Sequence, residues 1–360
     1  MKKAFIVLEN GQVFEGQRFG ADGEALGELV FTTGMVGYIE TLTDPCYYGQ
    51  IVVQTFPLLG NYGMINEDTE GKKSFVKGVV VREWCDTPSN FRMDSDIDEY
   101  LKKENIVGIC GLDTREITQI IRENGVMNAK IVDEVTDDVL AEIKNYKIKE
   151  AVKSVSKGET ETFEAKGDEE YTVAVVDLGE KSDIVKQLNK RGCKVVAVPY
   201  DTSADEILKY NPDGVMLTEG PGNPADETGT VEQVKALMGK VPMFGIGLGH
   251  QIMALAAGAK TEKLKYGHRG ANQPVKNLEI GQTYITSQNH GYAVVADSLP
   301  QGVEQAFVNA NDGTCEGVKY TDKKAFSVQF HPEAGSGPMD TEFLFDKFVE
   351  MMGGKNNAVK

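Results

Sequence analysis

The spacing of apolar residues divides the chain into two parts with different rhythms. In the first part, alternating runs such as AFIVLENGQVFEGQRF predict strands, and Asn10-Gly11 between two runs predicts a hairpin turn. Further strand-like runs follow at ELVFTT, QIVVQTF and FVKGVVV. The segment GLDTREITQIIRENG has helical spacing instead, with a cap at Asp113 and a stop at Gly125. We therefore expect a strand-rich α+β domain over residues 1–150.

After residue 170 the rhythm becomes a regular alternation of strands and helices, from the strand YTVAVVD to the strand VPMFGIG. This alternation predicts an α/β domain over residues 171–360, with a doubly wound, mostly parallel sheet. In such sheets, ligands bind at the carboxyl ends of the strands. The intervening segment is polar and shows no periodicity, so we expect a linker over residues 151–170.

One stretch, VPMFGIGLGHQIMALAAGAK, reads as a strand, a glycine-dense turn and an apolar helix. Elbows of this kind carry a nucleophile at the middle position of G-x-S-x-G or G-x-C-x-G, because the strained turn exposes that side chain above the sheet. Here the middle residue is Gly247, which has no side chain. The pattern therefore predicts a nucleophile elbow that lacks its reactive atom.

Composition narrows the classes of function. The length of 360 residues suits two domains, and no apolar run approaches the roughly 18 residues of a membrane span. The N-terminus has no secretory pattern, so we expect a cytoplasmic protein without a membrane partner. A net charge of −17 argues against nucleic acid as a partner. The five cysteines are scattered without C-x-x-C spacing, which predicts neither a disulfide framework nor a zinc site.

All four histidines lie in the second half, and one of them is in a suggestive position. The segment FSVQFHPEAGSGPMD places His331 and Glu333 two residues apart after an apolar run. On a strand, these side chains leave on the same side, so the carboxylate can orient and polarise the imidazole. Alone, this pair would be read as a surface histidine beside a glutamate. Together with the elbow, it predicts the base and the orienting acid of a catalytic triad.

Other motif readings are weaker. The glycines of the elbow do not match the dinucleotide pattern G-x-G-x-x-G, and no phosphate-loop sequence is present. His250, His268 and His290 lack the spacing of a metal motif. We therefore expect no metal and no cofactor on this chain, and we expect these three histidines to be hydrogen-bonded or to face substrate.

The elbow, the G-P-G loop and the H-P-E segment together resemble the class I, triad-type glutamine amidotransferases. The resemblance to the small subunits of carbamoyl phosphate synthetase covers nearly the whole chain. It includes TGMVGYIETLTDPCYYGQIVVQTFPLLGNYG and GLDTREITQIIRENG in the first half, and GPGNPAD, KYGHRGANQPV, ITSQNHGYAV and FSVQFHPEAGSGPMD in the second.

The resemblance implies a function and a site. In this family a cysteine attacks the carboxamide of glutamine, and ammonia passes to a large subunit that handles bicarbonate and uses ATP and Mg²⁺. The amide of Leu248, with one from the G-P-G loop, would form the oxyanion hole. The implied glutamine-contacting residues are Cys46, Gly220, Gly222, Leu248, Gln251, Asn289, Gly291 and Tyr292.

The chain also departs from the family pattern. The family cysteine corresponds to Gly247 here. Around the G-P-G loop, Glu219 replaces the more usual Asn and Asn223 the more usual Asp. In addition, Cys46 replaces Ser, and Tyr292 often corresponds to Phe. We therefore expect a subunit for arginine or pyrimidine synthesis that binds glutamine but hydrolyses it negligibly. Alternatives are a catalytically silent glutamine sensor or scaffold, and a subunit of another synthetase, which the N-terminal domain disfavours. Cys46 as a substitute nucleophile is disfavoured because no elbow or base is built for it.

Overall fold

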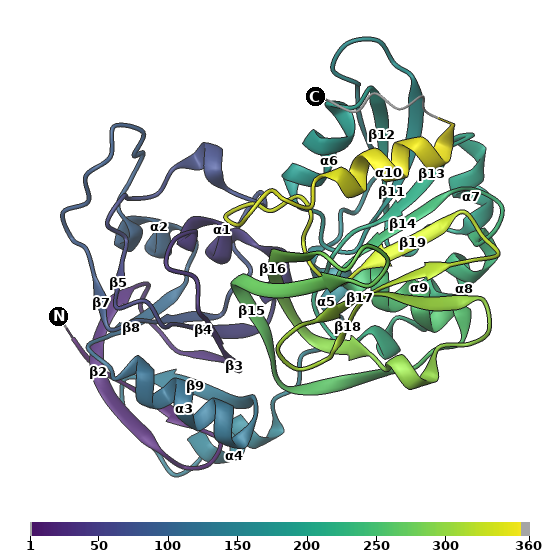
Figure 1. Cartoon of the computed structure of the whole chain (residues 1–360). Coiled ribbons are helices and arrows are strands. Elements are labelled where there is room, and N and C mark those ends of the chain that lie inside the picture. The colour runs from purple at the N-terminus through teal and green to yellow at the C-terminus, as the bar shows by residue number, and fades with distance from the viewer. Residues whose placement is uncertain (1, 354–360) are drawn as a thin grey trace. The chain divides into compact units, whose positions relative to one another are not determined.

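The structure is a computed structural model that describes residues 2–353. The chain forms two compact units, of which the first ends at Ala151 and the second begins at Val152 (Figure 1). Strands outnumber helices among the described residues, and the predicted α/β class with a strand-rich first half is confirmed. No helix within residues 2–353 has the length and apolar character needed to cross a membrane.

The first unit is built around a closed β-barrel, in which β9 pairs with β1 to complete the circle. The predicted hairpin is confirmed, with Gly11 at φ 89° between antiparallel β1 and β2. The predicted helix is α3, whose Asp113 carboxylate accepts hydrogen bonds from the amides of Arg115 and Glu116. In barrel order the strands are β1 (Lys3–Leu8), β2 (Val13–Gly20), β8 (Val107–Cys110), β6 (Gly78–Val80), β4 (Gln50–Gln54), β3 (Ala25–Thr32) and β9 (Met127–Val132). The remaining elements are the pair β5 (Leu58–Leu59) and β7 (Glu83–Trp84), and the helices α1 (Tyr38–Thr43), α2 (Ile97–Lys103), α3 (Thr114–Asn124) and α4 (Val139–Asn145).

The second unit contains a ten-stranded sheet with a parallel centre. In sheet order, the five parallel strands are β12 (Cys193–Pro199), β11 (Tyr171–Asp177), β13 (Gly214–Leu217), β14 (Met243–Ile246) and β19 (Ala325–Val328). The edge strand β10 (Glu161–Phe163) runs antiparallel to β12. The helices are α5 (Ala151–Val155), α6 (Ser182–Asn189), α7 (Ala204–Lys209), α8 (Thr228–Leu237), α9 (Leu248–Ala257) and α10 (Phe343–Met352).

Four antiparallel strands extend this centre and close on themselves. They are β15 (Thr261–Asn277), β16 (Thr283–Val294), β17 (Val303–Asn309) and β18 (Cys315–Tyr320). β15 pairs with β16 and β17, and β18 pairs with both β16 and β17, so the four form a ring. We call this part the four-strand ring; it is joined to the parallel centre through β18 and β19.

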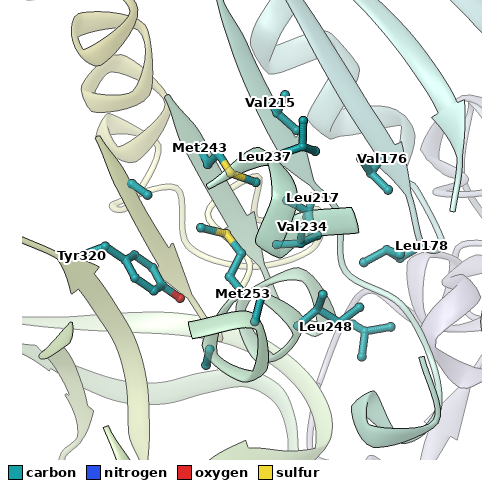
Figure 2. Close-up of a cluster of buried hydrophobic side chains, with 14 of the residues drawn as sticks. Val176, Leu178, Val215, Leu217, Val234, Leu237, Met243, Leu248, Met253 and Tyr320 are labelled. Carbon is teal, nitrogen blue, oxygen red and sulfur yellow. The ribbon is translucent and has the colours of Figure 1, made fainter. Parts of the chain in front are cut away.

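Apolar side chains cover both faces of the parallel centre. Along β11, Val176 lies in one core, while Val173 and Val175 lie in the other, because successive side chains of a strand point to opposite faces. Figure 2 shows the first core, to which α8 contributes Leu237 and α9 contributes Met253. The second core is covered by α6 and α10. Helices on both faces are the doubly wound arrangement that the sequence predicts.

The segment expected to be a linker, residues 151–170, differs from that expectation. It carries α5, whose Val152 is fully buried in the first core of the second unit, and β10, which pairs with β12. A helix and a strand this short contain less than two periods of any apolar pattern, so periodicity does not reveal them. Their polar composition then resembles that of a linker.

Candidate active site

The glycine-dense turn is a sharp elbow between β14 and α9. Gly247 has φ 55° and ψ −112°, a backbone conformation that strains residues with a side chain. Three backbone hydrogen bonds fix the turn: Gly247 donates to the carbonyl of Val328, Gly249 to that of Thr218, and Gln251 to that of Gly247. The elbow is therefore held by main-chain groups, independently of any side chain at position 247.

Glu219 lies directly against this elbow. It follows β13, is 1% exposed, and its Cβ is 2.8 Å from the position that a Cβ at Gly247 would take. One carboxylate oxygen of Glu219, one ring nitrogen of His331 and one carboxylate oxygen of Glu333 all lie within 4.8 Å of one another. The place where a nucleophilic side chain would begin is therefore bordered by an acidic residue.

The G-P-G loop next to Glu219 approaches the neighbouring strand end closely. A Cβ at Gly220 would lie 2.3 Å from the carbonyl oxygen of Leu178, so the loop can take this path only with glycine there. Gly222 has φ 96°, which also favours glycine. The Asn223 side chain accepts a hydrogen bond from the amide of Ala225 and caps a short 3-10 turn. These contacts fix the loop at the strand ends, as the sequence predicts.

His331 and Glu333 form a hydrogen-bonded pair. Nδ1 of His331 lies 3.0 Å from Oε1 of Glu333, and both residues are almost completely buried. The backbone of His331 donates to the carbonyl of Ser287 on β16, which fixes the segment that follows β19. When Nδ1–H donates to the carboxylate, Nε2 is the ring atom left to accept a proton. The geometry is that of a base and its orienting acid.

Lys181 is the third member of this buried group. Its Nζ lies 3.1 Å from both Nδ1 of His331 and Oε1 of Glu333, and the residue is 5% exposed. Burial acts to raise the pKa of Glu333, but the charges of Lys181 and His331 outweigh it and lower that pKa to about 2. Glu333 is therefore ionised at neutral pH, and an ammonium group already serves as its counter-ion.

Four neighbouring parallel strands bring these groups together. Lys181, Glu219, Gly247 and His331 follow the carboxyl ends of β11, β13, β14 and β19, which are adjacent in the sheet. This edge is where open α/β sheets bind ligands. Sequence reasoning missed Lys181, although LGEKSD comes directly after the predicted strand YTVAVVD. Its place just after the carboxyl end of a parallel strand could have indicated a residue of the site.

Two residues predicted to contact glutamine have side chains engaged elsewhere. Leu248 is buried, and its side chain lies in the core of Figure 2, which leaves its backbone amide as the group for a substrate. The Gln251 amide nitrogen donates to the carbonyl of Tyr292 at 2.7 Å and to Oε1 of Gln329 at 2.8 Å. Gln251 thus ties α9 to β16. The fully buried Gln329 lies in the FSVQFHPEAGSGPMD segment, but sequence reasoning assigned it no role.

The other predicted contacts fall on β16 and in the first unit. Asn289, Gly291 and Tyr292 are partly buried residues of β16. Cys46 is buried in the first unit, where its backbone amide donates to the Asp44 carboxylate at 2.8 Å. Contact of these residues with glutamine stays a prediction.

His250 has a structural environment. It is fully buried, and its Nδ1 lies 2.8 Å from the Ser327 hydroxyl. Burial lowers the pKa of His250 to about 3, so the ring is neutral. This histidine connects α9 with β19 and is hydrogen-bonded, as the sequence predicts.

Comparisons with known proteins match both halves of the chain. Residues 174–351 match the family model of class-I glutamine amidotransferases, and residues 6–131 match that of the CPSase domain of the carbamoyl-phosphate synthase small chain. The carbamoyl phosphate synthase small chain of Oceanobacillus iheyensis is 48% identical over 356 residues, covering 98% of this chain and 96% of the relative. That of Fusobacterium nucleatum is 49% identical over 349 residues, covering 96% and 97%. The chain belongs to the carbamoyl phosphate synthase small chain family.

Proposed function

We propose that this chain is the amidotransferase subunit of a carbamoyl phosphate synthase, and that it binds glutamine but hydrolyses it at a negligible rate. One observation carries the proposal. The elbow between β14 and α9 has its strained conformation, the His331–Glu333 pair lies at the same sheet edge, and residue 247 is a glycine. The site thus has a base, an orienting acid and backbone donors, and it lacks an attacking atom.

The chemistry that is missing follows from these roles. With a cysteine at position 247, His331 would take the thiol proton and deliver it to the departing ammonia, while Glu333 would orient the ring. The amide of Leu248 would stabilise the oxyanion. Removing the nucleophile of such a triad reduces turnover by on the order of 10⁶, or roughly 8 kcal/mol of transition-state stabilisation.

Glu219 adds a second obstacle to hydrolysis. Whenever Glu219 is ionised, its carboxylate would oppose the formation of a thiolate at position 247, since a like charge nearby raises the pKa of a thiol. The Cβ of a cysteine would also meet the Cβ of Glu219 at 2.8 Å, so one of the two must shift. The more usual asparagine would remove the charge.

Family membership supports the remaining parts of the proposal. The partner is a large subunit that binds ATP and Mg²⁺ and uses free ammonia, and this chain itself needs no cofactor. Within the second unit, glutamine would contact Gly220, Gly222, Gln251, Asn289, Gly291 and Tyr292. We place the complex in the cytoplasm.

The test compares four forms of the chain, each in complex with its large subunit: the unmodified chain, Gly247→Cys, Glu219→Asn and the double variant. Glutamate release from glutamine and carbamoyl phosphate formation from ammonia are measured for each. We expect no glutamate from the unmodified chain or Glu219→Asn, and slow release from Gly247→Cys. The double variant should release glutamate faster than Gly247→Cys, because asparagine cannot place a negative charge beside the thiolate. Ammonia should support all four forms equally.

Two results would contradict this proposal. Glutamate release by the unmodified chain at the rate of the double variant would reveal another nucleophile, and Cys46→Ser would identify it if Cys46 is responsible. Failure of the unmodified complex to bind glutamine by calorimetry, with ammonia-dependent activity intact, would leave the silent scaffold as the function. Glutamine binding that changes the ammonia-dependent rate would indicate a sensor.

A further inference from the structure

A buried cluster inside the four-strand ring has the donor atoms of a metal site. Its members are His268 on β15, His290 and Gln288 on β16, and Glu316 on β18, which are 8%, 8%, 2% and 0% exposed. Their spacing along the chain matches no metal motif. The antiparallel register nevertheless places His268 directly opposite His290. The pairing of the strands thus brings together donor residues that the spacing along the sequence does not place near one another.

The donor atoms are separated as ligands of a tetrahedral ion are. Nδ1 of His268 lies 3.2 Å from Nε2 of His290 and 3.4 Å from Oε1 of Glu316. Oε1 of Gln288 lies 3.1 Å from Nε2 of His290. Bond lengths of about 2.0–2.1 Å to tetrahedral Zn²⁺ place neighbouring ligands about 3.3–3.4 Å apart. These three separations are close to those that a zinc ion would impose, and the donor atoms of His268, His290 and Glu316 all lie within 4.8 Å of one another.

Both histidines are held with one ring nitrogen directed into the cluster. Nδ1 of His290 is 2.8 Å from the carbonyl of Tyr292, which only accepts, so Nδ1 carries the hydrogen and Nε2 presents its lone pair. Nε2 of His268 is 2.8 Å from a carboxylate oxygen of Asp312. Metal-binding histidines have such outer acceptors. When Nε2 of His268 carries the hydrogen that Asp312 accepts, Nδ1 of His268 and Nε2 of His290 present lone pairs to each other. A cation between these two nitrogens would satisfy both.

The cluster also contains an acidic side chain that can serve as a ligand. Glu316 is a fully buried carboxylate whose oxygens accept from Asn309 at 3.1 Å and from Gln288 at 3.0 Å. Nδ1 of His268 faces Nε2 of His290 at 3.2 Å, so a hydrogen shared between these two atoms is the alternative to a metal ion at this place.

We propose that Nδ1 of His268, Nε2 of His290, Oε1 of Glu316 and Oε1 of Gln288 bind one Zn²⁺. Four protein donors with almost no exposure form a closed site, which is the structural rather than the catalytic type. The ion would join β15, β16 and β18. Because alternate residues of a strand face opposite sides, it would also fix β16 from behind Asn289 and Gly291. This site is additional to the proposed glutamine site.

The test measures metal binding by the full-length chain after a chelator has removed any bound ion. Zn²⁺ is added and counted by elemental analysis after gel filtration, and Co²⁺ serves as the spectroscopic probe. We expect one Zn²⁺ per chain and the intense visible absorption of tetrahedral Co²⁺. His268→Gln and Glu316→Gln should abolish both signals. Asp312→Asn, which alters a half-exposed outer acceptor, should weaken Zn²⁺ binding by about 10-fold to 100-fold.

The matched control is His331→Gln. It removes another buried histidine that is hydrogen-bonded to a carboxylate, and it dismantles the second group of clustered donor atoms, Glu219, His331 and Glu333. The control should keep its zinc. If a cluster variant does not fold by circular dichroism, Asp312→Asn decides the question. A metal content well below one per chain in the unmodified protein, or zinc kept by Glu316→Gln and Asp312→Asn at full affinity, would overturn the proposal. Metal content is read independently of glutamine hydrolysis.

Discussion

Glu333 can stay ionised in the protein interior because His331 and Lys181 both contact one of its carboxylate oxygens. Oε1 lies 3.0 Å from Nδ1 of His331 and 3.1 Å from Nζ of Lys181. Removing one partner of a buried ion pair leaves an uncompensated charge, which costs about 3–5 kcal/mol. We predict this loss in the free energy of unfolding for Lys181→Met. Adding Glu333→Gln should restore part of it, and urea unfolding of the two single variants and the double variant measures the coupling.

The depressed pKa of Glu333 also gives stability a defined dependence on pH. Its folded pKa of about 2 lies below the ordinary 4.5, so the folded state binds this proton more weakly than the unfolded state. The contribution is complete above about pH 5 and is lost as the pH falls towards 2. Between these values the free energy of unfolding should fall more steeply for the unmodified chain than for Glu333→Gln. Equal slopes in urea titrations would contradict the assignment.

At the scale of elements, α9 reaches the end of β13 only because of Gly249. A Cβ there would lie 2.6 Å from both the Cβ and the carbonyl oxygen of Leu217. Gly249→Ala should therefore move the helix and destabilise the chain by about 1–3 kcal/mol. The control is Gly229→Ala on α8, where the added Cβ meets nothing within 4 Å. It should be neutral or stabilising by up to about 1 kcal/mol, and equal unfolding free energies would argue against the close packing.

The periodicity of apolar residues predicted the strands and helices that bury apolar side chains. It missed the strands that bury polar side chains. Strand β11 reads clearly because Val173, Val175 and Val176 fill the two cores. The apolar pattern does not predict the strands of the four-strand ring, because buried polar residues such as Gln288 and Glu316 interrupt the apolar alternation. The same contrast holds at the site. The His331–Glu333 pair is local and was predicted, whereas the contact of Lys181 with it spans 150 residues.

At the scale of the molecule, two units with separate cores should unfold separately. Calorimetry should resolve two transitions, because multidomain chains depart from two-state behaviour. Ile51 is fully buried in the first unit and Ile184 in the second. Replacing either by Val costs about 0.5–1.5 kcal/mol, so each change should lower only one transition. Zn²⁺ should raise only the transition that Ile184→Val lowers, and a single transition moved by both variants would refute this independence.

The three main-chain hydrogen bonds of the elbow have a consequence for the history of the gene. Since Val328, Thr218 and Gly247 supply only backbone groups, the hydrogen bonds of the turn do not require a side chain at position 247. The glycine codons GGT and GGC become cysteine codons through a single base change. A glutamate codon at position 219 needs two changes to become asparagine. We therefore predict that selection on glutamine as the nitrogen source would introduce a thiol at position 247 before it changes position 219, so that a slow amidotransferase would precede a faster one.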